Sequence, residues 1–203
     1  MKSTKLFFAN LFVLALAFSS CDKENNNIIP TPEPTPPANP TEKILILDTR
    51  EWTSWTYIDF KTGKTQKYAI QENDATTGVT IDWQIAIHSY LDVKTNGLSG
   101  LNTGKTKFEE VTSAPKDGYS EDVEHRIIKK LIMPPSPETF LNTKVSRALA
   151  PFEGSPMGNG RINDKVLILK CKDGKFVKLQ YLDNSNDEGV KGFMKIKYVY
   201  PFK

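Results

Sequence analysis

The sequence is poor in the residues on which most enzymes and metal sites rely. Its 203 residues include two cysteines, Cys21 and Cys171, and two histidines, His88 and His125. There are no paired carboxylates in a recognisable catalytic setting, no serine or cysteine nucleophile with a histidine at motif spacing, no phosphate-binding loop and no zinc-binding pattern. We therefore expect no enzymatic activity.

An excess of charge of one sign is lacking as well. The chain has 27 basic and 24 acidic residues, a net charge of +3, and loss of Lys2 and Lys5 with a cleaved leader would leave 25 basic against 24 acidic residues. Proteins that bind nucleic acid through its phosphates usually carry a clear basic surplus. Nucleic acid is therefore not an expected partner.

A hydrophobic run long enough to cross a membrane is missing too. Residues 6–18 are apolar except for Asn10, which is shorter than the roughly 20 residues that a membrane-spanning helix needs. The run follows Lys2 and Lys5 and leads through two serines to Cys21, the layout of a secretory signal with a bacterial lipobox. Residues 1–20 are thus a predicted signal peptide, and Cys21 is a predicted lipidation site. Ordinary secretory cleavage that leaves Cys21 free is the alternative.

Residues 21–42 have the composition of a tether. Six prolines between positions 30 and 40 favour extended, polyproline-like conformations, and the segment has too few apolar residues to bury a core. Residues 43–203 are enough for one domain with a hydrophobic core. With Cys21 lipidated, Cys171 has no partner for an intramolecular disulfide, so the stability must come from that core.

The first half of the predicted domain has several strand patterns. Residues 44–47 form a short apolar run, and residues 55–60 and 65–70 flank a Lys-Thr-Gly-Lys turn, which predicts a hairpin. In residues 81–88 the apolar side chains recur at every second position, so Ile81, Trp83, Ile85 and Ile87 are expected to share one face of a half-buried strand.

The second half is less regular until its end. Residues 93–107 are glycine-rich and predict a loop or a sheet edge, residues 107–113 a minor helix, and residues 124–132 a strand. Residues 134–163 show no strict period, which in a compact domain often marks a functional segment. Residues 165–171 and 176–182 predict a hairpin across Asp173-Gly174, and residues 193–200 alternate as a last strand. At least seven strand candidates and no convincing long helix predict an all-β domain of antiparallel sheets, sandwich-like, with at most a short helix.

The arrangement of these motifs resembles the HmuY family of haem-binding Bacteroidetes lipoproteins. The resemblance covers most of residues 43–203 and rests on the following stretches: Trp52, Trp55, Tyr57 and Phe60 in an early strand; Asp82-Trp83-Gln84-Ile85-Ala86-Ile87-His88; Thr95-Asn96-Gly97; Lys165-Val166-Leu167-Ile168-Leu169; Asp173-Gly174-Lys175-Phe176-Val177-Lys178-Leu179-Gln180; and Tyr198-Val199-Tyr200-Pro201.

The resemblance implies a haemophore-like protein that captures haem, with host haemoproteins as its source, and passes it to a TonB-dependent receptor of the outer membrane. It also implies a lipid-anchored protein of the outer membrane, displayed on the cell surface. The acidic residues after Cys21 loosely resemble the surface-export tags of Bacteroidetes lipoproteins.

The resemblance also indicates candidate haem ligands. Members of the family hold the iron by two histidines or by two methionines, and Met133 and Met157 fall in the two segments that carry these ligands. A thioether is a soft, neutral donor that favours ferrous haem iron. His88 belongs to the family's framework, and His125 lies in a charged segment where an exposed histidine needs no further explanation. The other interpretation is that Met133 is core filler and Met157 a loop residue.

A haem pocket also needs apolar walls and a cation for the propionates. Phe140, Leu141, Leu149 and Phe152 are the candidate walls, and Lys144 or Arg147 the candidate cation.

A second functional hypothesis keeps the β scaffold without haem. A surface lipoprotein of this kind would bind a glycan or a protein, with Trp52, Trp55 and Trp83 as a possible sugar platform.

Overall fold

The structure is a computed structural model that describes residues 41–130, 139–154 and 159–203. Met133, Met157, the predicted signal peptide, Cys21 and nearly all of the predicted tether lie outside the described residues. The described residues from Thr41 onward belong to one compact unit, Asn39–Lys203.

The described residues form an all-β fold with one turn of 3-10 helix, as the sequence predicts. The elements are β1 (Lys43–Asp48), β2 (Ser54–Asp59), β3 (Lys64–Ala69), β4 (Ile85–His88), β5 (Asp92–Thr95), β6 (Ser99–Asn102), η1 (Phe108–Glu110), β7 (Val123–Ile128), β8 (Phe140–Val145), β9 (Phe152–Glu153), β10 (Arg161–Ile162), β11 (Val166–Lys170), β12 (Phe176–Ser185) and β13 (Lys191–Phe202). Within this part of the chain no helix is long and apolar enough to span a membrane.

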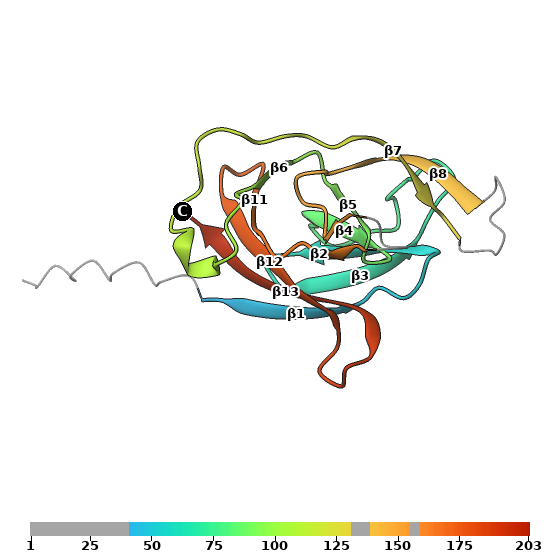
Figure 1. Cartoon of the computed structure of the whole chain (residues 1–203). Coiled ribbons are helices and arrows are strands. Elements are labelled where there is room, and N and C mark those ends of the chain that lie inside the picture. The colour runs from blue at the N-terminus through green and yellow to red at the C-terminus, as the bar shows by residue number, and fades with distance from the viewer. Residues whose placement is uncertain (1–40, 131–138, 155–158) are drawn as a thin grey trace, which may run out of the picture. The chain divides into compact units, whose positions relative to one another are not determined.

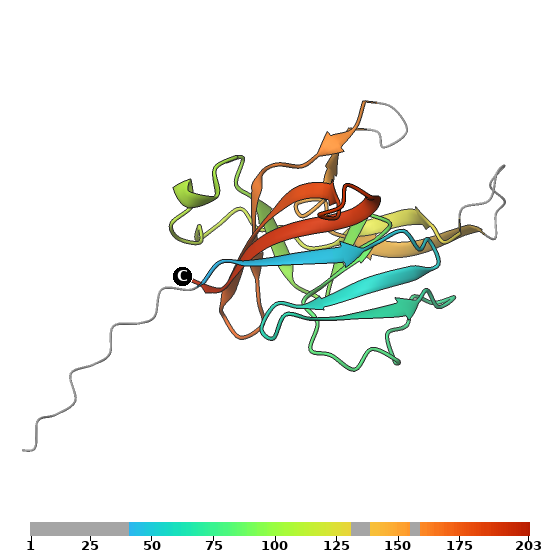
Figure 2. The same cartoon turned by 90° about the horizontal axis from the view of Figure 1, so that it is seen from below.

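Two antiparallel sheets form a sandwich (Figures 1 and 2). The larger sheet has the strand order β1-β13-β12-β11-β6, and the smaller has the order β3-β2-β4-β5. Between them lies the main core, to which the smaller sheet contributes Ile58, Ile85 and Ile87 and the larger contributes Leu179 and Ile196. The predicted alternation of residues 193–200 is therefore confirmed, since Met194, Ile196 and Tyr198 all face this core.

The outer face of the smaller sheet is buried as well. The hairpin of β7 and β8 packs on it through Ile127, Leu141 and Val145, which meet Trp55 and Tyr57 of β2 in a second hydrophobic cluster. All four residues of β4 are consequently buried. The prediction of a half-buried strand over residues 81–88 was thus wrong about burial. It was also wrong in two other respects: the strand begins only at Ile85, and Trp83 packs in the second cluster rather than with Ile85 and Ile87.

A third cluster lies on the outer face of the larger sheet. Phe108 of η1 packs there with Ile168 and Phe202. The buried Lys178 fastens the helical turn, because its ammonium donates hydrogen bonds to the carbonyls of Phe108 (3.2 Å) and Val111 (3.0 Å) and lies 4.1 Å from the centre of the Phe108 ring. Burial lowers the pKa of Lys178. The minor helix predicted over residues 107–113 is thus this single turn.

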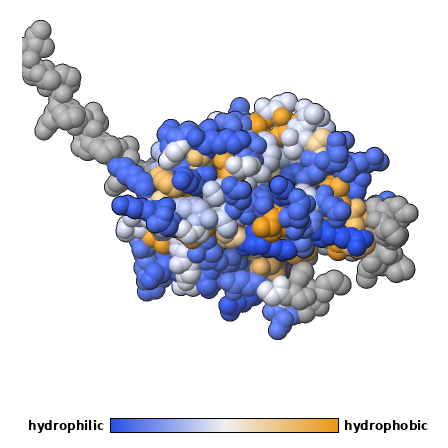
Figure 3. All heavy atoms as spheres, turned by 90° about the horizontal axis from the view of Figure 1, so that it is seen from above, coloured by the Kyte–Doolittle hydropathy of each residue, from blue (hydrophilic) through white to orange (hydrophobic). Residues whose placement is uncertain are grey.

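The irregular middle of the chain contains more strands than the sequence predicts. The glycine-rich residues 93–107 include β6, which is indeed a sheet edge, but also most of β5. Residues 134–163 contain β8 and the short pair β9 and β10. The surface is largely hydrophilic on the face shown in Figure 3, with apolar side chains scattered over it in small groups.

Candidate functional site

Residues of β7 and β8 help to line two cavities, which share no lining residue. We call the first the arginine cavity. Its volume is about 280 Å³, and it is lined by Trp52, Leu91, Asp92, His125, Arg126, Ile127, Ile128, Arg147, Ala150, Phe152 and Gly154. The lining combines apolar and aromatic walls with the cationic Arg147, which is the composition that a flat, apolar molecule with an anionic edge requires.

A buried histidine supports the inner wall of the arginine cavity. His88 is 0% exposed, its Nε2 lies 2.9 Å from the carbonyl oxygen of Trp52, and its ring packs against Trp52 and Trp55. Its Nδ1 lies 3.6 Å from an Asp92 carboxylate oxygen. His88 is therefore a packing residue of the framework, as the family resemblance implies.

The second histidine lines the cavity, which the sequence did not indicate. His125 Nδ1 lies 2.8 Å from Arg147 Nη2, and its Nε2 lies 3.7 Å from Asp92 Oδ1. A guanidinium can only donate, so Nδ1 of His125 must be the acceptor, and the ring proton is on Nε2, directed toward Asp92. Nδ1 is thus occupied by the guanidinium, whereas Nε2 is beyond hydrogen-bond distance of Asp92.

The predicted pocket residues are spread over several places in the fold. Phe152 and Arg147 line the arginine cavity, and Phe152 contacts the Tyr90 ring at 5.8 Å between ring centres. Leu149 is fully buried in the main core, where the Tyr181 hydroxyl donates a hydrogen bond to its carbonyl oxygen. Leu141 packs in the second cluster. The remaining two are Phe140, whose ring centre lies 4.1 Å from the Arg126 guanidinium, and Lys144, which lines the other cavity.

In the sequence, each of the two candidate iron ligands comes a few positions after a residue that lines the arginine cavity. Met133 comes five positions after Ile128, and Met157 comes three positions after Gly154, and both of these preceding residues line the cavity. The described residues contain no group of three or more histidine, cysteine and acidic side chains that could hold a metal ion.

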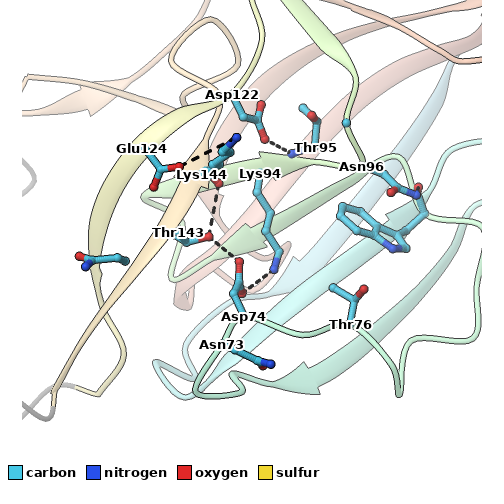
Figure 4. A pocket seen from close by; sticks show the side chains of 13 residues that line it. Asn73, Asp74, Thr76, Lys94, Thr95, Asn96, Asp122, Glu124, Thr143 and Lys144 are labelled. Carbon is cyan, nitrogen blue, oxygen red and sulfur yellow. Dashed lines mark hydrogen bonds and ion pairs between the residues drawn. The ribbon is translucent and has the colours of Figure 1, made fainter.

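We call the other cavity the lysine cavity. Its volume is about 440 Å³, and it is lined by Asn73, Asp74, Thr76, Trp83, Lys94, Thr95, Asn96, Gly97, Asp122, Glu124, Asn142, Thr143 and Lys144. Lys94 reaches from β5 to Asp74 at its floor (Figure 4), and their Nζ and Oδ1 atoms are 2.7 Å apart. The side chain of Lys94 is 6% exposed, and burial lowers its pKa.

The floor of the lysine cavity is a closed polar network. Asp74 also accepts hydrogen bonds from Trp55 Nε1 at 3.1 Å and from the Thr143 hydroxyl. The Lys94 ammonium lies over the rings of Trp55 and Tyr57, at 4.4 and 5.4 Å from their centres. Trp55 cannot take part in the sugar platform suggested for the three tryptophans, because it is 0% exposed beneath this network.

Comparison with known proteins identifies relatives. The family model described as "HmuY protein" matches residues 51–198. A structure from Bacteroides vulgatus ATCC 8482, described as an HmuY-like heme-binding protein, has 29% identity and a TM-score of 0.65, with 80% of this chain and 93% of that chain covered. The apo HmuY analogue of Tannerella forsythia has 25% identity and a TM-score of 0.68, with 81% and 98% covered.

A further structure shares the fold. A protein of Bacteroides fragilis NCTC 9343 described as a lipoprotein has 23% identity and a TM-score of 0.66, with 80% of this chain and 92% of that chain covered. No curated protein matches the chain.

Proposed function

Because this chain belongs to the HmuY family, we propose that it is a haem-binding surface lipoprotein and that the arginine cavity receives the haem. The observation that carries the proposal is the composition of that cavity, in which Trp52, Ile128 and Phe152 supply apolar walls and Arg147 a cation. The described walls enclose about 280 Å³, just below the roughly 300 Å³ at which small-molecule pockets begin, so they suit one edge of a macrocycle rather than the whole of it.

The iron ligands in this proposal are Met133 and Met157. Two observations favour them: both follow lining residues of the arginine cavity by a few positions, and Nδ1 of His125 is occupied by Arg147. When bound, haem supplies an iron whose soft thioether ligands favour the ferrous state. The chain's own residues orient the macrocycle, keep water from it and neutralise a propionate.

The rest of the chain serves export and anchoring in this proposal, and haem is passed on to a receptor. Residues 1–20 direct export, Cys21 carries the lipid at the outer membrane, residues 21–42 tether the domain, and residues 43–203 bind haem at the cell surface. Haem would come from host haemoproteins and pass to a TonB-dependent receptor. The alternative hypothesis of a glycan or protein ligand in place of haem predicts no spectral response to haem.

A haem titration tests the proposal. Full-length protein in detergent is titrated with ferric haem and, under dithionite, with ferrous haem, while the Soret band is followed. We expect a saturable shift at one haem per chain, stronger in the ferrous state, and loss of that spectrum in Met133→Ala and Met157→Ala. His125→Ala is the matched control and should keep it. Absence of a shift in both oxidation states would refute haem binding, and a normal spectrum in both methionine variants would refute these ligands.

A further inference from the structure

Asp122 lines the lysine cavity across from its floor, and the hydrogen-bonding capacity of its carboxylate is only partly used. Asp122 accepts a hydrogen bond from the backbone N–H of Thr95 at 2.7 Å through Oδ2, whereas its Oδ1 is buried and has no hydrogen-bond partner among the described residues (Figure 4). A buried carboxylate oxygen without a donor costs free energy that a bound donor group would recover. Burial also raises the pKa of Asp122.

Amide side chains that line the cavity also have unused hydrogen-bonding capacity. Asn142 makes no side-chain hydrogen bond within the described part of the chain, and the Asn73 amide accepts one from Ala75 N–H but donates none there. Asn96 donates to the Trp83 carbonyl and keeps its own oxygen unused by any described residue. The cavity thus offers unused donors and acceptors, in contrast to the satisfied network of Asp74, Lys94 and Thr143 at its floor.

The charges that line the cavity come close to balance. Lys94 is paired with Asp74 at 2.7 Å, and Lys144 lies 3.9 Å from Glu124. Of the three carboxylates that line this cavity, Asp122 therefore has no ion pair with a described residue. A cationic ligand would face two ammonium groups, and an anionic ligand would face Asp122 and Glu124. A neutral molecule whose groups both donate and accept avoids both repulsions.

We propose that the lysine cavity is a second binding site, separate from the arginine cavity, for a neutral polyhydroxylated molecule such as a sugar residue. Hydroxyl groups donate to Asp122 Oδ1 and accept from the amides of Asn73 and Asn142, and Trp83 supplies an apolar surface at the side. The cavity volume of about 440 Å³ is in the range of small-molecule sites. The closed network of Asp74 and Lys94 holds the floor rigid.

The site is tested with defined sugars. Full-length protein is titrated with glucose, galactose, arabinose and N-acetylglucosamine, and with the charged analogues glucosamine and glucuronate, by saturation-transfer NMR and tryptophan fluorescence. We expect at least one neutral sugar to bind saturably and Asp122→Asn, which puts a donor where the free acceptor is, to weaken it about tenfold or more. Asn142→Ala, an exposed residue at the rim, should weaken it several-fold without affecting the fold.

The controls separate this site from the rest of the molecule. Asp187→Asn removes a carboxylate that is 75% exposed and pairs with Lys195, and it should bind as the wild type does. Arg147→Ala should also bind the sugar normally, since Arg147 lines the other cavity. The proposal is overturned if no neutral sugar binds, if only the charged analogues bind, or if both Asp122→Asn and Asn142→Ala bind as tightly as the wild type while their thermal unfolding shows them to be folded.

Discussion

Arg147 donates a hydrogen bond to Nδ1 of His125 across 2.8 Å, and this one contact fixes the roles of both residues. The histidine is held as an acceptor toward the guanidinium, with its other nitrogen directed at Asp92. The guanidinium in turn keeps its remaining N–H groups for an anion at the cavity.

Arg147 is expected to contribute more to haem affinity than Lys144, although both were candidate cations. A hydrogen bond to a charged group contributes about 1.5–3 kcal/mol, so Arg147→Ala should weaken haem binding about tenfold or more, and the loss should shrink at high salt. Lys144→Ala is the matched control because Lys144 lines the lysine cavity. Equal affinities of the two variants, measured by Soret titration, would contradict this assignment.

Replacing His125 should leave the haem spectrum unchanged. In His125→Ala the guanidinium loses an acceptor but no iron ligand, so the Soret maximum should stay in place and the affinity should change by no more than about threefold. A shifted maximum or a high-spin spectrum in this variant would make His125 a ligand and overturn its assignment as a partner of Arg147.

Leu149 and Phe152 should give opposite phenotypes. Leu149 is 0% exposed in the main core, so Leu149→Ala should lower the free energy of unfolding by about 2–5 kcal/mol and leave haem binding by the folded protein intact. Phe152 is half-buried and lines the arginine cavity, so Phe152→Ala should weaken haem binding with a smaller loss of stability. Urea unfolding and haem titration of both variants test this difference. Weaker haem binding in Leu149→Ala together with the larger loss of stability in Phe152→Ala would contradict the positions assigned to the two residues.

Ionisation of the Asp122 carboxyl should change how the free energy of unfolding depends on pH. Burial raises the pKa of Asp122 in the folded state above the usual 3.8. Between pH 3.8 and the raised pKa, the folded state therefore holds a proton that the unfolded state has lost. Its contribution therefore stabilises the fold below pH 3.8 and is lost as the pH rises through the raised pKa.

Asp122→Asn removes this contribution. The free energy of unfolding of the variant, measured in urea at several pH values, should rise more steeply with pH over that interval than that of the wild type. Asp187→Asn, at an exposed carboxyl, is the control. Parallel pH profiles for Asp122→Asn and the wild type would rule out the raised pKa.

Much of the fold could be predicted because local patterns and tertiary burial agree. Residues 193–200 alternate strictly, and the structure buries Met194, Ile196 and Tyr198 as the pattern requires. The Asp173-Gly174 turn was predictable for a similar reason, since Gly174 adopts a φ of +76° that suits glycine. In both cases nothing distant in the sequence alters the local preference.

The errors arise where a distant segment changes the environment. A half-buried β4 was the reasonable interpretation of its alternation, but the β7–β8 hairpin covers the second face with Ile127 and Leu141. The signal for β8 was present, because Leu141, Thr143 and Val145 alternate with Asn142 and Lys144, but the nearby prolines concealed it.

In the candidate site, too, residues with a local signal could be predicted, whereas residues whose role depends on distant segments could not. Phe152 and Arg147 could be singled out by residue type within one segment. Asp92 and His125 could not, because their role depends on contacts between β5, β7 and the chain near Arg147. The lysine cavity was missed entirely, since its lining comes from at least four separated stretches of sequence.

The β7–β8 hairpin forms its own two-stranded sheet and is attached to the smaller sheet mainly by side-chain packing rather than by a shared ladder of hydrogen bonds. Local opening of such a unit costs only part of the free energy of global unfolding. Amide protons of β7 and β8 should accordingly exchange with solvent sooner than those of β12, which is paired on both sides. Since residues of this hairpin line both cavities, its local opening is expected to widen both of them while the two main sheets stay packed.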